Sequence, residues 1–142
     1  MLIVLMMKIW LLSISIMDIQ SRRVPVWMLV VEGSLAAAAV ICQFWTGDVK
    51  LFDALTGILP GIGLFLIALT TKKVGTGDGI VLIFLGVMSG WGKSMMIFGI
   101  SLFLISICSV LLLILRKVKR NTGIPYLPFL TAAWILTDKL SV

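Results

Sequence analysis

The stretch that decides the fold is the apolar run MLIVLMMKIWLLSISIM, residues 1–17, followed directly by the polar stretch DIQSRRVP, residues 18–25. A nearly uncharged run close to 20 residues long is typical of a transmembrane helix. The Arg22-Arg23 pair that follows predicts that this helix ends at the cytoplasmic side. The rest of the chain repeats the pattern of long apolar runs separated by short charged stretches.

The composition extends this interpretation to the whole chain. Of the 142 residues 61% are hydrophobic and 13% are charged, with a mean hydropathy of +1.19. Soluble domains are about 45–50% apolar and about 25% charged, so a soluble domain is excluded. At about 20 residues per crossing, the length allows about six spans. We expect an all-α polytopic membrane protein in which residues 1–142 form a single transmembrane domain.

Six apolar segments can be drawn, and their charges predict the sidedness. The segment at 80–91 is short and is read either as a span or as a re-entrant piece. Counted as a span, it leaves eight basic residues on one side and three on the other, which favours both termini outside the cytoplasm. A re-entrant segment would move the basic run at 116–120 outside, against that rule. The segments cover residues 1–17, 26–45, 51–71, 80–91, 94–115 and 124–136; the cytoplasmic set is Arg22, Arg23, Lys72, Lys73, Arg116, Lys117, Lys119 and Arg120, and the outer set is Lys50, Lys93 and Lys139.

The same counts restrict partners and chemistry. The net charge of +6 lies in clusters between apolar runs, which indicates membrane topology and a bilayer environment rather than a nucleic-acid partner. The sequence has no histidine, and Cys42 and Cys108 stand alone inside apolar runs. These facts exclude imidazole bases and paired-cysteine motifs, so we expect no metal and no cofactor. Catalysis would have to use carboxylates, hydroxyls or lysines.

Four of the six acidic residues have structural interpretations. Asp48 and Asp138 are expected in water at span ends, and Asp53 near the start of the third helix. Glu32 lies about 10 Å into the membrane, where an ionisable side chain suggests function. We expect it to form a buried pair with Lys8 on the first helix, or to be neutral and hydrogen-bonded between helices. A direct catalytic role for Glu32 is a further alternative.

Asp18 and Asp78 stand apart from the other acids. Both lie at cytoplasmic ends of spans, Asp18 at the end of the first and Asp78 at the start of the fourth. Each could be an ordinary helix-end charge, but Gly75, Gly77 and Gly79 around Asp78 allow close approach by another segment. Two carboxyl groups close together in a poorly hydrated site share one proton, as in aspartic proteases. The ionised carboxylate would activate water, and the protonated one would donate to the scissile bond.

Three motifs resemble the bacterial type IV prepilin leader peptidases. Gly75-Thr76-Gly77-Asp78 matches the GxGD motif of membrane aspartyl proteases. The stretch DIQSRRVP at 18–25 resembles the family's segment after its first core helix. The stretch GIPYLPFL at 123–130 is similar to the segment that opens its last helix. A lone GxGD is common, whereas three motifs in order over the whole chain are specific.

The resemblance implies an aspartyl endopeptidase of the bacterial inner membrane that removes the basic leader from prepilins or pseudopilins at the cytoplasmic face. It implies Asp18 and Asp78 as the catalytic pair, Arg23 and Pro25 in the first loop and Gly75 and Gly77 in the second. The helix opening at 124–125 would pack beside the site.

The chain also departs from the family pattern. It resembles the short, core-only members without the cysteine-bearing domain, so methyl transfer is not predicted. Ile80 replaces a common lysine and Val26 a common asparagine, and Lys72 and Lys73 could supply positive charge instead. Two other classes stay open, a small ion-coupled transporter or channel subunit and a non-catalytic assembly component. A transporter needs ionisable groups near the membrane midplane, whereas both aspartates lie at its edge.

Overall fold

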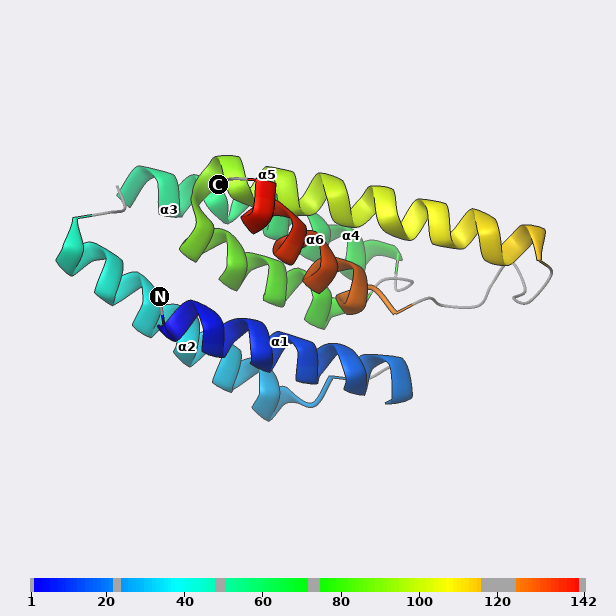
Figure 1. Cartoon of the computed structure of the whole chain (residues 1–142), viewed down its shortest axis with the longest axis horizontal. Coiled ribbons are helices and arrows are strands. Elements are labelled where there is room, and N and C mark those ends of the chain that lie inside the picture. Colours follow the sequence, from blue (N-terminus) through cyan, green and yellow to red (C-terminus); the bar gives the residue numbers. More distant parts are fainter. Residues whose placement is uncertain (1, 22–23, 48–50, 72–74, 116–124, 141–142) are drawn as a thin grey trace.

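An α-helix forms within each of the six apolar segments in the computed structural model, which describes every residue except 1, 22–23, 48–50, 72–74, 116–124 and 141–142 (Figure 1). No strand occurs in the described part of the chain, as predicted for an all-α membrane protein. The helices are α1 (Leu2–Ser21), α2 (Val26–Thr46), α3 (Leu51–Gly57), α4 (Leu59–Thr71), α5 (Thr76–Ile114) and α6 (Leu127–Leu140).

Among the described residues, four helical stretches are long and apolar enough to cross a membrane. They are Ile3–Ser21, Val26–Thr46, Leu51–Thr70 and Thr76–Ile114, the third combining α3 with α4. A helix of 39 residues would be about 58 Å long, nearly twice the thickness of the bilayer core, so α5 cannot be one straight span.

The chain reverses direction inside α5 at Gly90. This residue has φ 74° and ψ 176°, which only glycine adopts readily. A Cβ atom on Gly86 would lie 3.0 Å from Ser94 Oγ, although eight residues of continuous helix span about 12 Å. Figure 1 shows the two arms, residues 76–89 and 91–114, running in opposite directions. The predicted fourth and fifth segments are therefore the two arms of this helical hairpin.

Glycines let the first arm of α5 pack closely against α3 and α4. A Cβ atom on Gly57 would lie 2.2 Å from the carbonyl oxygen of Gly86. One on Gly61 would lie 2.6 Å from the Ile83 backbone nitrogen. Small residues at such positions allow the backbones of membrane helices to approach each other. This packing fixes the arm that begins with Asp78.

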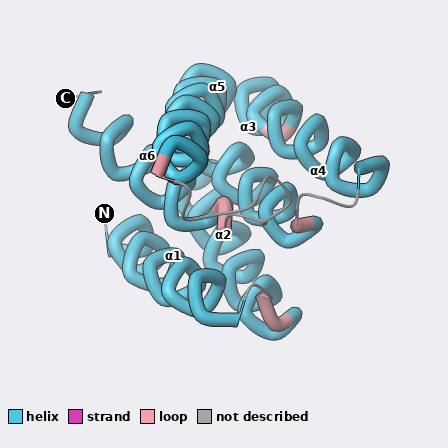
Figure 2. Tube along the Cα trace, turned by 90° about the vertical axis from the view of Figure 1, so that its right-hand side faces the viewer, coloured by secondary structure: helices cyan, strands magenta, loops and turns pink. Residues whose placement is uncertain are grey.

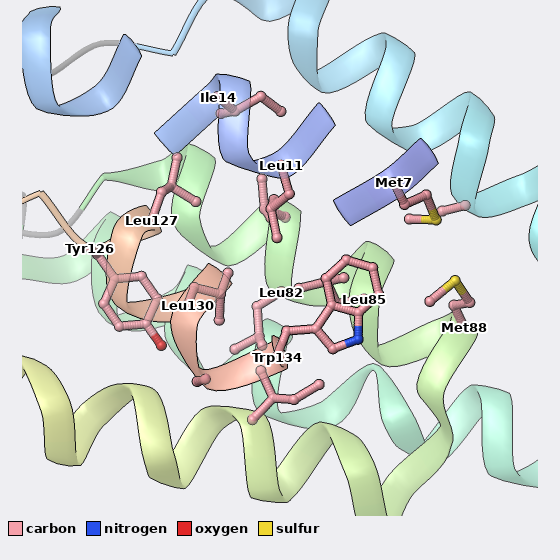
Figure 3. Packing of buried hydrophobic residues seen from close by; sticks show 14 of the residues in the cluster. Met7, Leu11, Ile14, Leu82, Leu85, Met88, Tyr126, Leu127, Leu130 and Trp134 are labelled. Carbon is pink, nitrogen blue, oxygen red and sulfur yellow. The ribbon is translucent and has the colours of Figure 1, made fainter. Parts of the chain in front are cut away.

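The core joins α1 and α6 to the same arm. Figure 3 shows side chains from α1, α5 and α6 packed together, including Leu11, Leu82 and Leu130, which are fully buried. Seen end-on in Figure 2, α6 lies between α1 and the second arm of α5. In Figure 1 the end of α1 and the starts of α2, α5 and α6 lie at one end of the bundle.

Candidate active site

Asp18 lies in the last turn of α1 and is almost completely buried. Its side chain belongs to a residue only 7% exposed, although it stands next to the polar connection to α2. The backbone N–H of Leu127, the first residue of α6, donates a hydrogen bond to its carboxylate. The second oxygen, Oδ2, is buried and accepts no hydrogen bond from the described residues. One oxygen of Asp18 is thus held by α6, and the other has its lone pairs available for chemistry.

Asp78 lies in the first turn of α5 and is equally buried, at 7% exposed. Its backbone N–H donates to the carbonyl oxygen of Gly75 at 3.1 Å, and its carboxylate accepts from the Gly75 N–H. The second bond is the half of a capping box in which the side chain at the third helical position accepts from the N-cap N–H, while the first bond joins two backbone groups because the N-cap, Gly75, has no side chain. Asp78 therefore is a helix-end carboxylate, as one of the two interpretations expected. An ordinary helix-end carboxylate is solvated, however, whereas this one is buried.

The two carboxyl groups are close enough to interact electrostatically. A negative charge on Asp18 acts directly on Asp78, in a region that is largely removed from water. Simultaneous ionisation of both is unfavourable under these conditions, and a shared proton relieves the repulsion. The end of the first helix and the start of the hairpin arm, 60 residues apart in sequence, are brought to one place as expected.

The three glycines around Asp78 differ in how closely neighbouring atoms approach them. None of them has a positive φ, so freedom of the backbone is not their role. A Cβ atom on Gly79 would lie 2.7 Å from the Phe65 Cα, so α4 could not pack here. One on Gly75 would lie 3.1 Å from the Asp78 carboxylate, whereas Gly77 has only ordinary contacts with Val24, at 3.7 Å or more.

The other motif residues frame the site. Pro25 is the N-cap of α2, and its carbonyl oxygen accepts the first hydrogen bond of that helix, from Met28 at 3.0 Å. Arg23 lies outside the described residues. The last helix begins at Leu127 rather than at 124, and Leu127 reaches Asp18 as the predicted packing neighbour of the site.

Tyr126 and Ser101 were not among the predicted site residues. The buried Tyr126 hydroxyl lies 2.5 Å from Ser101 Oγ on the second arm of α5. Tyr126 also interacts electrostatically with Asp78. Tyr126 belongs to the stretch at 123–130, so a signal for it existed. Ser101 is one of several serines in an apolar run, and nothing in the sequence distinguishes it.

The predicted Lys8–Glu32 pair is wrong. Lys8 forms an ion pair with Asp138 on α6, and its ammonium lies 5.6 Å from the centroid of the Trp134 ring. Asp138, expected in water, is only part exposed and also has Lys93 at 4.0 Å. Glu32 is fully buried, and neither of its oxygens has a hydrogen-bond partner among the described residues, so the interhelical hydrogen bond is not found either.

The reason for this difference is the orientation of α1. Trp10 donates a hydrogen bond to the Met28 carbonyl at 3.3 Å, so the Trp10 face of α1 meets α2. Lys8 is two residues away, about 200° around the helix, and therefore points toward α6. Of the other acids, Asp53 lies exposed in the first turn of α3 as predicted, and Asp48 is outside the described residues.

No three histidine, cysteine or carboxylate side chains gather into a possible metal site within the described ranges. The chemistry on hand at the site is that of two buried carboxyl groups and the backbone N–H groups that bond to them. This set can activate water and transfer protons.

Comparison with known proteins identifies a family. A family model described as the type IV leader peptidase family matches residues 5–114, which include Asp18 and Asp78 and stop short of the stretch at 123–130. No curated protein matches the chain. No solved structure matches it either. Since the family model covers more than half of the sequence, this membrane protein belongs to the type IV leader peptidase family.

Proposed function

We propose that this peptidase is an aspartyl endopeptidase that removes the basic leader from type IV prepilins or pseudopilins. The observation that carries the proposal is the placement of Asp18 and Asp78, both 93% or more buried, at one end of the bundle and within electrostatic reach of each other. Family membership supports peptide cleavage, and the two carboxyl groups supply an acid and a base for it.

The proposed reaction needs one proton shared by the pair. The ionised carboxylate takes a proton from water as the water oxygen bonds to the scissile carbonyl carbon. The protonated carboxyl group donates to the carbonyl oxygen as the tetrahedral intermediate forms. The C–N bond then breaks as the carboxyl group that took the proton from water donates it to the leaving amine, and a hydroxyl of the intermediate gives its proton to the other carboxylate as the carbonyl re-forms, so the pair is singly protonated again.

The proposed site faces the cytoplasm of a bacterial inner membrane. In the sequence, the basic pair at 22–23 follows the end of α1 that carries Asp18, the pair at 72–73 precedes the start of α5 that carries Asp78, and the cluster at 116–120 follows the second arm of α5. The opposite side carries Lys50, Lys93 and Lys139, and this imbalance favours the clustered side as cytoplasmic. In this proposal the two arms of α5 are separate crossings and α6 is the last, which gives six crossings and puts both termini outside the cytoplasm.

The test is leader removal from a purified prepilin whose leader ends in glycine before the hydrophobic helix. Wild type, Asp18→Asn and Asp78→Asn are compared in the same detergent, with Asp53→Asn as the matched control because Asp53 is an exposed aspartate on α3. Each site variant is expected to lose at least about a hundredfold in rate, the scale of an acid–base catalyst. The control is expected to cleave like the wild type.

A further inference from the structure

The two helices that carry the proposed catalytic pair are connected through α6. Among the described residues, the backbones of α1 and α5 pack against α2 and α6 rather than against each other. Figure 2 shows α6 between α1 and the second arm of α5. The position of α6 therefore helps to set the separation of Asp18 and Asp78.

Polar contacts fix the register of α1 against α6. They occur at three levels along the antiparallel pair, and the residue numbers in each contact add to 145 or 146, so each step along α1 is matched by one along α6. The three contacts are the Lys8–Asp138 ion pair, the Ser15–Thr131 hydrogen bond at 3.3 Å and the Leu127 N–H bond to Asp18. Asp18 is the last member of this series.

The direction of the Ser15–Thr131 bond follows from its neighbours. Thr131 Oγ1 already donates its only hydrogen within α6, to the Pro128 carbonyl at 2.8 Å or the Leu127 carbonyl at 3.2 Å. Ser15 must then be the donor to Thr131. Both residues are 96% buried, so no water replaces a lost partner cheaply.

The contact between α6 and α5 is also a hydrogen bond between two hydroxyl groups, one of which already donates within its own helix. Ser101 Oγ donates to the Phe98 carbonyl at 2.8 Å, so Tyr126 must be the donor in the 2.5 Å contact between the two hydroxyls. Tyr126 directly precedes Leu127, the residue that binds Asp18. One end of α6 is thus tied to α5 by a side chain and to Asp18 by the next backbone N–H.

From this arrangement, and resting on the proposed function, we infer that Ser15 and Ser101 are positioning residues that fix α6 against α1 and against the second arm of α5, and so set the geometry of the catalytic pair. They touch neither the reacting atoms nor each other. Ser15 acts through Thr131 on the α1 side, and Ser101 acts through Tyr126 on the α5 side. Misplacement of reacting groups by about 1 Å can cost about a hundredfold in rate.

The kinetic test compares Ser15→Ala and Ser101→Ala with two matched controls. Ser13→Ala on α1 removes a hydroxyl that, among the described residues, bonds only to Ile9 of its own helix, and Ser106→Ala on α5 removes an exposed hydroxyl. The positioning variants are expected to lower kcat about 10- to 100-fold with KM unchanged, and the controls to leave both unchanged. Tyr126→Phe added to Ser101→Ala should cause no further loss, because both changes break one contact.

A rescue separates positioning from simple loss of packing. The exchange Ser15→Thr with Thr131→Ser keeps two hydroxyls and the total volume, so it is expected to recover kcat to within about threefold of the wild type. If Ser15→Ala and Ser101→Ala lower only the melting temperature while kcat of the folded enzyme stays the same, the inference is wrong.

A distance measurement distinguishes failure of this inference from failure of the proposed function. Asp18→Cys and Asp78→Cys are combined in a Cys42→Ala, Cys108→Ala background and joined with thiol-specific cross-linkers of graded length. Adding Ser101→Ala is expected to change which lengths react, and adding Ser106→Ala is not. An unchanged length profile would overturn the inference even if Asp18→Asn abolishes cleavage, whereas active Asp18→Asn with a changed profile would overturn only the proposed function.

Discussion

The Ser94 hydroxyl oxygen lies 2.8 Å from the carbonyl oxygen of Gly57 and donates a hydrogen bond to it. This contact joins the second arm of α5 to α3, and Gly86 on the first arm approaches the same carbonyl. The turn at Gly90 and the start of the arm at Asp78 are thereby held in one packed unit. The position of Asp78, one of the two proposed catalytic residues, thus depends on glycine packing farther along the bundle.

Gly86→Ala is expected to destabilise the protein by about 2 kcal/mol or more, by overpacking. Its Cβ atom would lie 2.0 Å from the Gly57 carbonyl oxygen, and backbone cannot move aside as a flexible side chain can. The matched control is Gly99→Ala on the same helix, where nothing lies within 4 Å. Circular dichroism during unfolding in mixed micelles measures the free energy of unfolding of both variants. Equal stability of the two variants would show that close packing at Gly86 is not required.

Gly90→Ala tests the backbone conformation of the hairpin turn. A Cβ atom there would meet only Asp53, at 3.7 Å or more, so any loss must come from φ 74° rather than from crowding. A cost of about 1–3 kcal/mol is expected, with Gly92→Ala, which has open space and no positive φ, as the control. A Gly90→Ala protein that melts like the control would mean that the turn is made differently.

Glu32→Met is expected to raise the free energy of unfolding by about 1 kcal/mol or more and to leave cleavage intact. The reason is that the Glu32 carboxyl group is fully buried without a hydrogen-bond partner among the described residues, and an apolar side chain of similar volume removes that cost. If Glu32 were instead paired with Lys8, the same change would destabilise. A stable variant without activity would assign Glu32 a functional role.

Lys8→Met is expected to destabilise the protein more than Lys93→Met. Lys8 is the partner of Asp138 in a part-buried ion pair, while Lys93 is half exposed and 4.0 Å from the same carboxylate. Exposed pairs contribute about 0–1 kcal/mol, so Lys93→Met should change the melting temperature little. Thermal denaturation at low and high salt compares the variants, and a larger effect from Lys93→Met would contradict this assignment.

Much of the fold could be predicted because the bilayer imposes helix length and polarity. The six apolar segments, Pro25 at the start of α2 and the positions of Asp18 and Asp78 at the ends of their helices follow from span boundaries. The hairpin inside α5 could be predicted only in part. The short segment at 80–91 was visible, but its turn depends on the backbone of one glycine, Gly90, which looks in sequence like its neighbours Gly86 and Gly92.

The rotation of each helix about its axis could not be predicted. Membrane helices are apolar on nearly all faces, so periodicity does not show which face meets which neighbour. Depth alone suggested that Lys8 meets Glu32, whereas the Trp10 face of α1 meets α2 and Lys8 meets Asp138. The Ser101–Tyr126 contact escaped prediction for the same reason.

The central claim, that Asp18 and Asp78 act as one catalytic unit, is tested most directly by leader removal with Asp18→Asn, Asp78→Asn and the double variant. Each is purified and shown by circular dichroism to be folded. Because groups that act as a unit are not additive, the account predicts that each single change lowers the cleavage rate at least about a hundredfold and that the double change lowers it no further. A folded Asp78→Asn protein that removes the leader at the wild-type rate would contradict the claim.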